Sequence, residues 1–257
     1  MGINNSIIEN SAIIDSSAVI GKGNYIGHNT IIKGNVTIGD NNYIGSNVII
    51  GEYPQHSTKK FEFKNYTNFS NNKGIKIGSN NVIREFTSIH LPITSENTII
   101  GNNCYIMAYN HIAHDSVICN HVIMANNIQM GGYSIIHDYA NIGLSSAIHQ
   151  RSTIGAYAMV GMGSIVTKDV LPFMVVMGSP TKYANKINEY GMNRFGLSEN
   201  EITCAKKIYN GDTFKDIKLE VKIISLLKKF YKDSRNSQIS ISEKTNNSLL
   251  KYFLNND

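Results

Sequence analysis

The sequence has few cysteines and no long apolar segment. Its three cysteines, Cys104, Cys119 and Cys204, show no CxxC spacing, so free thiols in a reducing compartment are expected. No apolar run reaches the roughly 18 residues needed to cross a bilayer. The first residues also lack the basic and apolar blocks of a secretory signal. These absences predict a cytoplasmic protein without a membrane span.

Signature motifs of several enzyme classes are missing too. The sequence has no GxSxG elbow, no P-loop and no GxGxxG followed by an acidic residue,. HExxH and HxxxH spacings are absent as well, so neither a metal nor another cofactor is predicted.

Positive charge is concentrated in the last third of the chain. The net charge is +5, and residues 181–257 contain 14 Lys/Arg against 9 Asp/Glu, which accounts for all of it. Residues 1–180 are neutral. The asymmetry predicts an acidic partner for the C-terminal part, or simply a solvated helix face. No nucleic-acid partner is predicted.

A six-residue apolar repeat runs through most of the first 166 residues. Isoleucine, methionine or valine recurs at every sixth position from Ile8 to Ile50, from Ile77 to Ile89, and from Ile100 to Val166. A period of six fits neither a plain strand nor a helix. Three strand-turn units of six residues would close one coil of 18 residues, as in a parallel β-helix. The 23 repeats predict a prism roughly 35 Å tall at about 4.8 Å per coil.

The repeat has two interruptions and a different continuation. Residues 52–76 form a long polar loop with interspersed aromatic residues, and residues 90–98 form a shorter loop. Beyond Pro180 the pattern predicts helices. We therefore expect a β-helix over residues 1–180, with the inserted loop 52–76, and an α-helical C-terminal domain over residues 181–257.

Two local patterns carry the helix prediction. Ser198 and Glu201 have the spacing of a capping box,. A later apolar set shares one helical face, and its members are Phe214, Ile217, Val221, Ile224 and Leu227.

The predicted coil length groups a set of candidate site residues. Residues 18 apart should lie above one another, which places His114, Gly132 and Gln150 in one column with His111 and His149 beside it. The imidazole could act as a base, the glycine N–H could face a developing oxyanion, and the amide could orient a ligand. The same residues could also be ordinary polar side chains on a β-helix surface.

The sequence closely resembles the acyl-ACP:UDP-N-acetylglucosamine O-acyltransferases of lipid A biosynthesis. Besides the ladder and the helical tail, the resemblance rests on HIAHD at residues 111–115, ANN at 125–127, GG at 131–132 and HQ at 149–150. It covers nearly the whole chain. It implies a left-handed parallel β-helix that forms a homotrimer with active sites between neighbouring prisms. It further implies a nucleotide-sugar acceptor, a donor thioester on an acidic acyl carrier protein or coenzyme A, and no cofactor.

The resemblance assigns roles to individual residues. His114 is the implied general base and Gly132 the implied oxyanion donor. Substrate contacts are implied for a larger set: His111, Gln150, His149, Asn127, His56, Tyr133, Asn188 and Arg194.

Four departures from the family pattern touch the acceptor or acyl pocket. His56 stands in place of an aspartate, Tyr133 in place of the usual histidine, and Tyr190 in place of a glutamate, while the loop after Ile89 is altered and shortened. The base is retained while its surroundings differ. The sequence therefore favours an N-acyltransferase acting on a dTDP- or UDP-linked aminosugar for surface polysaccharides such as O-antigen. The alternative is the UDP-N-acetylglucosamine 3-O-acyltransferase of lipid A biosynthesis.

The expected mechanism is a direct attack of the acceptor on the thioester, with His114 as base. No covalent acyl-enzyme is needed, so Cys104 and Cys119 are not expected to be nucleophiles; Cys104 stands in a small-residue position of the repeat. A non-catalytic β-helix scaffold would explain the repeat. It would not explain the column at His114 or the basic tail.

Overall fold

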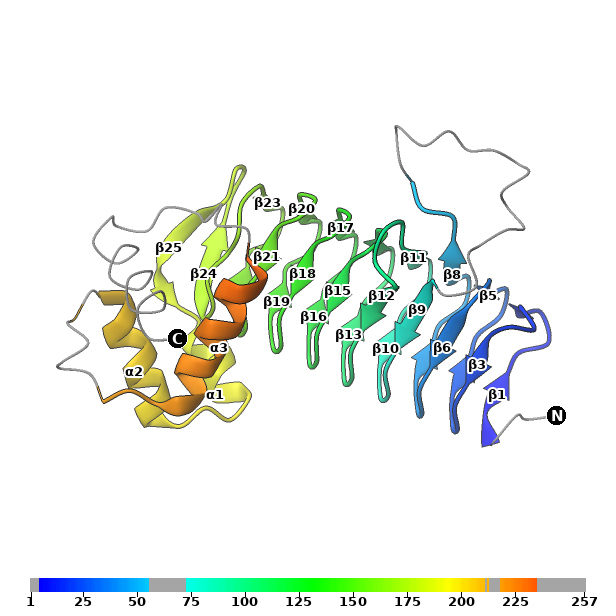
Figure 1. Ribbon diagram of the computed structural model, residues 1–257, viewed down its shortest axis with the longest axis horizontal. Helices are drawn as coiled ribbons and strands as arrows, with labels where there is room; N and C mark the ends of the chain where they lie inside the picture. Colours follow the sequence, from blue (N-terminus) through cyan, green and yellow to red (C-terminus); the bar gives the residue numbers. More distant parts are fainter. Residues whose placement is uncertain (1–4, 56–72, 211, 213–217, 235–257) are drawn as a thin grey trace.

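The computed structural model describes residues 5–55, 73–210, 212 and 218–234. Within them the chain forms 25 strands and three helices. Figure 1 shows the strands stacked as successive coils of an elongated prism, with the three helices gathered at its C-terminal end. His56 and most of the predicted loop 52–76 lie outside the described residues.

Every third strand of the prism belongs to the same sheet, so each coil has three faces. Sheet A contains β1 (Ile7–Ile8), β4 (Tyr25–Ile26), β7 (Tyr43–Ile44), β10 (Val82–Ile83), β13 (Tyr105–Ile106), β16 (Ile123–Met124), β19 (Asn141–Ile142), β22 (Met159–Val160), β24 (Met174–Met177) and β25 (Lys182–Ile187). Sheet B contains β2 (Ile13–Ile14), β5 (Ile31–Ile32), β8 (Ile49–Glu52), β11 (Ser88–His90), β14 (His111–Ile112), β17 (Gln129–Met130), β20 (Ala147–Ile148) and β23 (Ile165–Val166). Sheet C contains β3 (Val19–Ile20), β6 (Val36–Ile38), β9 (Gly74–Ile77), β12 (Asn97–Ile100), β15 (Val117–Ile118), β18 (Ile135–Ile136) and β21 (Thr153–Ile154).

The strand register confirms the 18-residue coil. Ile112 pairs with Met130 and Met130 with Ile148, in parallel and without a shift. The two interruptions lengthen single coils instead of shifting the repeat. Ile50 pairs with Ile89 across the first interruption, and Ile89 pairs with Ile112 across the second. Both insertions therefore leave the prism as loops.

The repeat residues fill the axis of the prism, as predicted. From Ile26 to Val166 each of them is at most 3% exposed. The residue before each of them points outward, because successive side chains of a strand face opposite sides. Cys104 is buried beside this core at 1% exposure, which confirms its predicted place.

The turns between faces use left-handed backbone conformations. Asparagine, which tolerates positive φ, occupies several of them, including Asn29, Asn47 and Asn103. Other turns carry aromatic residues that stack from coil to coil: the ring centroids of Tyr139 and Tyr157 lie 4.6 Å apart. Stacking offsets the cost of a bulky residue at positive φ.

The C-terminal unit begins with a strand, where the sequence predicted helix. β24 pairs with β22, and β25 returns antiparallel along β24. β25 thereby supplies partners for backbone groups at the open end of sheet A, which otherwise would be an unpaired edge.

The helices follow as α1 (Glu189–Arg194), α2 (Glu199–Asn210) and α3 (Val221–Asp233). The capping box before α2 is confirmed. The Ser198 backbone N–H donates to the Glu201 carboxylate at 2.7 Å, and the Glu201 N–H donates to the Ser198 hydroxyl at 3.3 Å. No described helix has the length and apolarity that a membrane crossing requires.

The buried face of α3 differs from the prediction. Ile223, Leu227 and Phe230 are fully buried, whereas Val221 at the first position is 84% exposed. Spacings of four and three residues put the buried side chains on one stripe, and Val221 lies outside it. Phe214 and Ile217 lie outside the described residues. Lys229 of α3 pairs with Asp138 of the prism at 3.1 Å, so the helix packs against the side of the β-helix.

Candidate active site

His114 lies in the turn between sheets B and C, directly after β14. The coil turns there because Asp115 adopts a left-handed conformation with φ of 58°. The side chain of His114 is largely buried. Its Nδ1 lies 2.7 Å from Oδ2 of Asp115.

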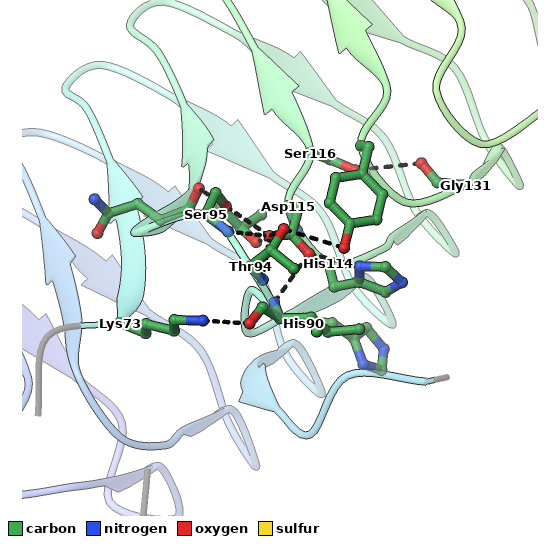
Figure 2. Close-up of polar contacts among 12 residues, drawn as sticks. Lys73, His90, Thr94, Ser95, His114, Asp115, Ser116 and Gly131 are labelled. Atoms are coloured by element: carbon green, nitrogen blue, oxygen red, sulfur yellow. Dashed lines mark hydrogen bonds and ion pairs between the residues drawn. The ribbon is translucent and has the colours of Figure 1, made fainter. Parts of the chain in front are cut away.

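Asp115 connects His114 to a neighbouring loop through hydrogen bonds. Besides His114, its carboxylate accepts hydrogen bonds from the backbone N–H groups of Ile93, Thr94 and Ser95 at 2.9, 2.9 and 2.6 Å. The Ser95 hydroxyl adds another bond of 2.7 Å. Figure 2 shows Thr94 and Ser95 on one side of Asp115 and His114 on the other. The loop of residues 91–96 is thereby fixed against the turn that carries His114.

The hydrogen bonds decide the charge state of Asp115. Burial acts to raise the pKa of the carboxyl, but the N–H groups of Ile93 and Ser95, the Ser95 hydroxyl and His114 outweigh it and bring the pKa well below its usual range,. Asp115 is therefore ionised at neutral pH and only accepts. The proton of neutral His114 is then on Nδ1, where the carboxylate accepts it.

Gly132 lies one coil further along, against the ring of His114. A Cβ atom on Gly132 would lie 2.5 Å from Cε1 and 2.7 Å from Nε2 of His114, so only glycine fits. Among the described residues the Gly132 N–H donates to no acceptor. It is thus available to an oxygen of a ligand held next to Nε2. The predicted column of His114 and Gly132 exists in the structure, and their chemical roles stay predictions.

His111 and His90 form a second pair on sheet B. Their ring centroids are 4.8 Å apart, and the Ser88 hydroxyl lies 3.2 Å from Nδ1 of His111. Burial, followed by the neighbouring histidines His90 and His114, lowers the pKa of His111 to about 4. Burial also lowers the pKa of His90, so both rings are neutral polar groups beside His114.

Three further predicted residues lie one or two coils beyond His114. Tyr133 follows Gly132, and its ring meets that of His114 edge-on at 5.1 Å. His149 and Gln150 are exposed in the next turn, where Nδ1 of His149 lies 3.0 Å from the Gln150 carbonyl oxygen. All three belong to the turn column of His114.

Asn127 lies elsewhere. It occupies the turn between sheets A and B, at the opposite end of β17 from Gly132. Its amide oxygen is 3.5 Å from Nε2 of Gln129. The family resemblance placed Asn127 among the substrate contacts, but a strand of sheet B separates it from His114.

Asn188 and Arg194 are also distant from His114 within one chain. Both line a cavity of about 530 Å³ over sheet A, together with Asn141 and Met159. The Asn188 amide donates to the Tyr157 carbonyl at 2.9 Å and accepts from the Gly191 N–H at 3.1 Å. Asn188 therefore has a structural role as the N-cap of α1. In a three-sided prism the turn between sheets B and C lies opposite sheet A, so this cavity and His114 face different directions.

Sequence reasoning missed the residues that hold Asp115 and the partner of His111. Thr94 and Ser95 lie in an inserted loop, where the repeat gives no register. His90 could have been found, because it directly follows the repeat residue Ile89, which pairs with Ile112. That register puts His90 beside the HIAHD segment.

Comparison with known proteins gives the family. A family model described as "Bacterial transferase hexapeptide (six repeats)" matches residues 17–52 and 97–127. A curated acyl-[acyl-carrier-protein]--UDP-N-acetylglucosamine O-acyltransferase of Burkholderia lata is 37% identical over 153 residues, 57% of this chain and 58% of that protein. One from Pseudomonas savastanoi is 42% identical over 135 residues, 52% of each chain. The chain thus spans little more than half the length of the curated relatives it matches.

Solved structures match over a larger share of both chains. A UDP-N-acetylglucosamine acyltransferase from Campylobacter jejuni is 25% identical with a TM-score of 0.70, covering 96% of this chain and 93% of its own. The LpxA protein of Acinetobacter baumannii is 30% identical with a TM-score of 0.66, covering 96% and 95%. The chain belongs to the UDP-N-acetylglucosamine acyltransferase family. The members of this family are hexapeptide-repeat proteins, and the fold of this member is the left-handed parallel β-helix that the sequence predicted.

Proposed function

We propose that the protein transfers an acyl group from the thioester of an acyl carrier protein to a hydroxyl group of UDP-N-acetylglucosamine. The observation that carries this proposal is the contact of Gly132 with the His114 ring, backed by the ionised Asp115. The names of the relatives from Burkholderia lata and Pseudomonas savastanoi support the donor and the acceptor.

The proposed reaction is a direct acyl transfer. Nε2 of His114 removes the proton from the attacking hydroxyl as its oxygen bonds to the thioester carbon. The Gly132 N–H donates to the oxyanion that forms, a contact worth roughly 3–4 kcal/mol of barrier in other enzymes. The carbon–sulfur bond then breaks, and the thiolate takes the proton from His114. Asp115 stabilises the imidazolium between the two steps.

The comparisons favour the hydroxyl acceptor over the amino acceptor that the sequence favoured. The relatives reported above that name a reaction are O-acyltransferases, and none of them supports an aminosugar substrate. The departures at Tyr133 and Tyr190 lie near the two halves of the proposed site and are compatible with an altered sugar pocket, but they do not specify an amine.

We also propose a homotrimer. Large apolar side chains are exposed around the edge between sheets A and B, and they include Tyr43 (42%), Phe86 (49%), Tyr109 (56%), Leu144 (46%), Met162 (72%) and Ile165 (44%). Exposed apolar side chains gathered along one edge are typical of an interface. Because the cavity with Arg194 faces away from His114 in one chain, a neighbouring copy would bring the two together.

The carrier protein is proposed to dock near α3. Lys222, Lys228 and Lys232 are exposed on this helix and give it a positive surface, whereas Lys229 pairs with Asp138. Acyl carrier proteins are acidic. Long-range attraction of this kind increases association rates and weakens with salt.

The test is an acyl-transfer assay by mass spectrometry. The purified protein is incubated with acyl-ACP or acyl-CoA and a panel of UDP- and dTDP-linked sugars, with and without a free amino group. A product with acyl-ACP and UDP-N-acetylglucosamine is expected, and His114→Ala should lower its rate by orders of magnitude without changing the oligomeric state. If only an aminosugar is acylated, the acceptor is an amino group, as the sequence favoured. Near wild-type turnover by His114→Ala would remove His114 as the base.

A further inference from the structure

Three residues with left-handed backbones follow one another along the edge between sheets B and C. Asp115, Tyr133 and Arg151 have φ values of 58°, 60° and 67°. Backbone hydrogen bonds tie them to the coil before: the Tyr133 N–H donates to the His114 carbonyl at 3.1 Å, and the Arg151 N–H donates to the Gly132 carbonyl at 2.9 Å. The edge therefore carries a buried carboxylate, an aromatic ring and a cation in fixed order next to His114.

The ring of Tyr133 is held from two sides. Its hydroxyl lies 3.1 Å from Oγ1 of Thr94, the residue whose N–H binds Asp115. The Tyr133 ring also packs against the His114 ring in a T-shaped arrangement, with an interplanar angle of 86°. Because both contacts involve fixed parts of the candidate site, Tyr133 forms a rigid platform.

Arg151 lies on this platform. The guanidinium carbon is 4.3 Å from the centroid of the Tyr133 ring, within the range of a cation–π contact. The Arg151 side chain is otherwise exposed. Among the described residues no carboxylate lies within ion-pairing distance of it, whereas Arg84 is neutralised by Glu85 at 2.8 Å. The site thus has a positioned, solvent-exposed cation.

We infer that Arg151 binds a phosphate group of a substrate, with Tyr133 as its support. Guanidinium groups are weakly hydrated and match the oxygens of phosphate in a bidentate manner. Stacking on Tyr133 restricts the side chain before the ligand arrives, which lowers the entropic cost of binding. The inference rests on the proposed function, in which both substrates carry phosphate. The acceptor carries the diphosphate of the nucleotide sugar, and the donor carries the phosphate of the pantetheine arm.

Two pairs of probes distinguish the sources. UDP and uridine differ in the diphosphate, and phosphopantetheine and pantetheine differ in the phosphate ester. Calorimetric dissociation constants of all four are compared for the wild type, Arg151→Ala and Arg151→Lys. Arg84→Gln is the control, since this paired arginine lies in another turn.

Arg151→Ala should weaken one phosphate-bearing probe by about 10- to 100-fold and leave its phosphate-free counterpart unchanged. A loss confined to UDP assigns the contact to the acceptor, and a loss confined to phosphopantetheine assigns it to the donor. Arg151→Lys should recover only part of the affinity, because a lysine keeps the charge without the planar contact. Equal affinities of the wild type and Arg151→Ala for both phosphate probes would overturn the inference.

The platform has its own test. Tyr133→Asn keeps a residue that tolerates the left-handed turn but removes the ring, and should weaken the same probe as Arg151→Ala. Tyr133→Phe keeps the ring and loses only the hydroxyl contact with Thr94, so it should keep most of the affinity. Wild-type affinity in Tyr133→Asn would contradict a supporting role. Binding needs no turnover, so an inactive wild type would count against the proposed reaction alone.

Discussion

His114 and Asp115 are adjacent in sequence, and Nδ1 of His114 is hydrogen-bonded to Oδ2 of Asp115 at 2.7 Å. Neighbouring side chains usually diverge, but the left-handed backbone of Asp115 turns its carboxylate back toward the imidazole. The three backbone N–H groups of residues 93–95 hold the carboxylate from the other side. A chain segment that precedes the site by some 20 residues thus fixes the orientation of the proposed base.

Asp115→Asn should distinguish the effect of Asp115 on the orientation of His114 from its effect on stability. The amide removes the negative charge and disturbs the tautomer of His114, so we expect kcat to fall by about 10²- to 10⁴-fold. Some of the N–H and O–H groups of residues 93–95 lose their acceptor, so the free energy of unfolding should fall by about 2 kcal/mol. Steady-state kinetics and urea denaturation measure the two effects.

Asp40→Asn is the matched control for this change. Asp40 also accepts a backbone N–H, from Lys22 at 2.7 Å, but it is exposed and far along the prism. It should keep wild-type kcat. A wild-type rate for Asp115→Asn would show that His114 needs no carboxylate partner.

Gly132→Ala should disable the site through a single methyl group. The new Cβ would lie 2.5 Å from Cε1 of His114, so the ring has to move away from the reacting carbonyl. We expect kcat to fall by at least about 100-fold with a folded protein by circular dichroism. Gly163→Asn is the control, because no atom lies within 4 Å of a Cβ there and asparagine tolerates its positive φ. Comparable kinetics for the two variants would exclude a special role for Gly132.

The β-helix was predictable because one period determines it. A spacing of six residues leaves only one arrangement that buries every repeat residue, and the register of Met130 with Ile148 follows from it. The neighbours His114 and Gly132 were found by the same arithmetic. The spacing predicts which side chains are neighbours where the pairing between coils is rigid and the side chains are short.

The rest of the site depends on segments without a period. Thr94 and Ser95 reach Asp115 from an inserted loop whose path the sequence does not encode in any spacing. The substrate contact predicted for Asn188 stays a prediction; its amide caps α1, a use that depends on where the helix starts. The strand β25 was missed because its stability comes from pairing with β24, which local propensity does not reveal.

Stability should depend on pH through His137. This ring is 1% exposed, and its Nε2 lies 3.4 Å from Oδ2 of Asp233. Burial, reinforced by Lys229 and opposed by Asp233 and Asp138, lowers its pKa to about 4. The unfolded chain, with an ordinary histidine pKa of about 6.5, binds the proton first as the pH falls. The contribution of His137 is therefore complete above about pH 6.5 and is lost as the pH falls toward 4.

The slope of this loss is up to about 1.4 kcal/mol per pH unit. His137→Gln removes the titrating group, so the difference in unfolding free energy between pH 7 and pH 5 should shrink by about 2 kcal/mol. Urea denaturation at the two pH values measures it. An unchanged difference would place the acid sensitivity in other groups, such as His111.

Reversal of charge on α3 should affect only the binding of the carrier-protein donor. Lys222→Glu combined with Lys232→Glu is expected to raise the KM for acyl-ACP several-fold at low salt, as rim charges do, and to leave the KM for acyl-pantetheine unchanged. Lys22→Glu, at the far end of the prism, is the control for a charge reversal remote from α3. If the KM for acyl-pantetheine rises equally, the helix acts on the site and not on the carrier.

Mixed oligomers should show that the site is shared between copies. In one chain His114 lies at the edge between sheets B and C, and the cavity with Arg194 lies over sheet A. If a neighbour supplies the cavity, His114→Ala and Arg194→Ala proteins are each defective in every site. After the two are unfolded together and refolded at equal amounts, about a quarter of the sites combine an intact His114 with an intact Arg194. Activity should therefore recover to about that fraction of the wild type. Separately refolded proteins, mixed afterwards, provide the control, and a mixture that recovers nothing after joint refolding would place the complete site within a single chain.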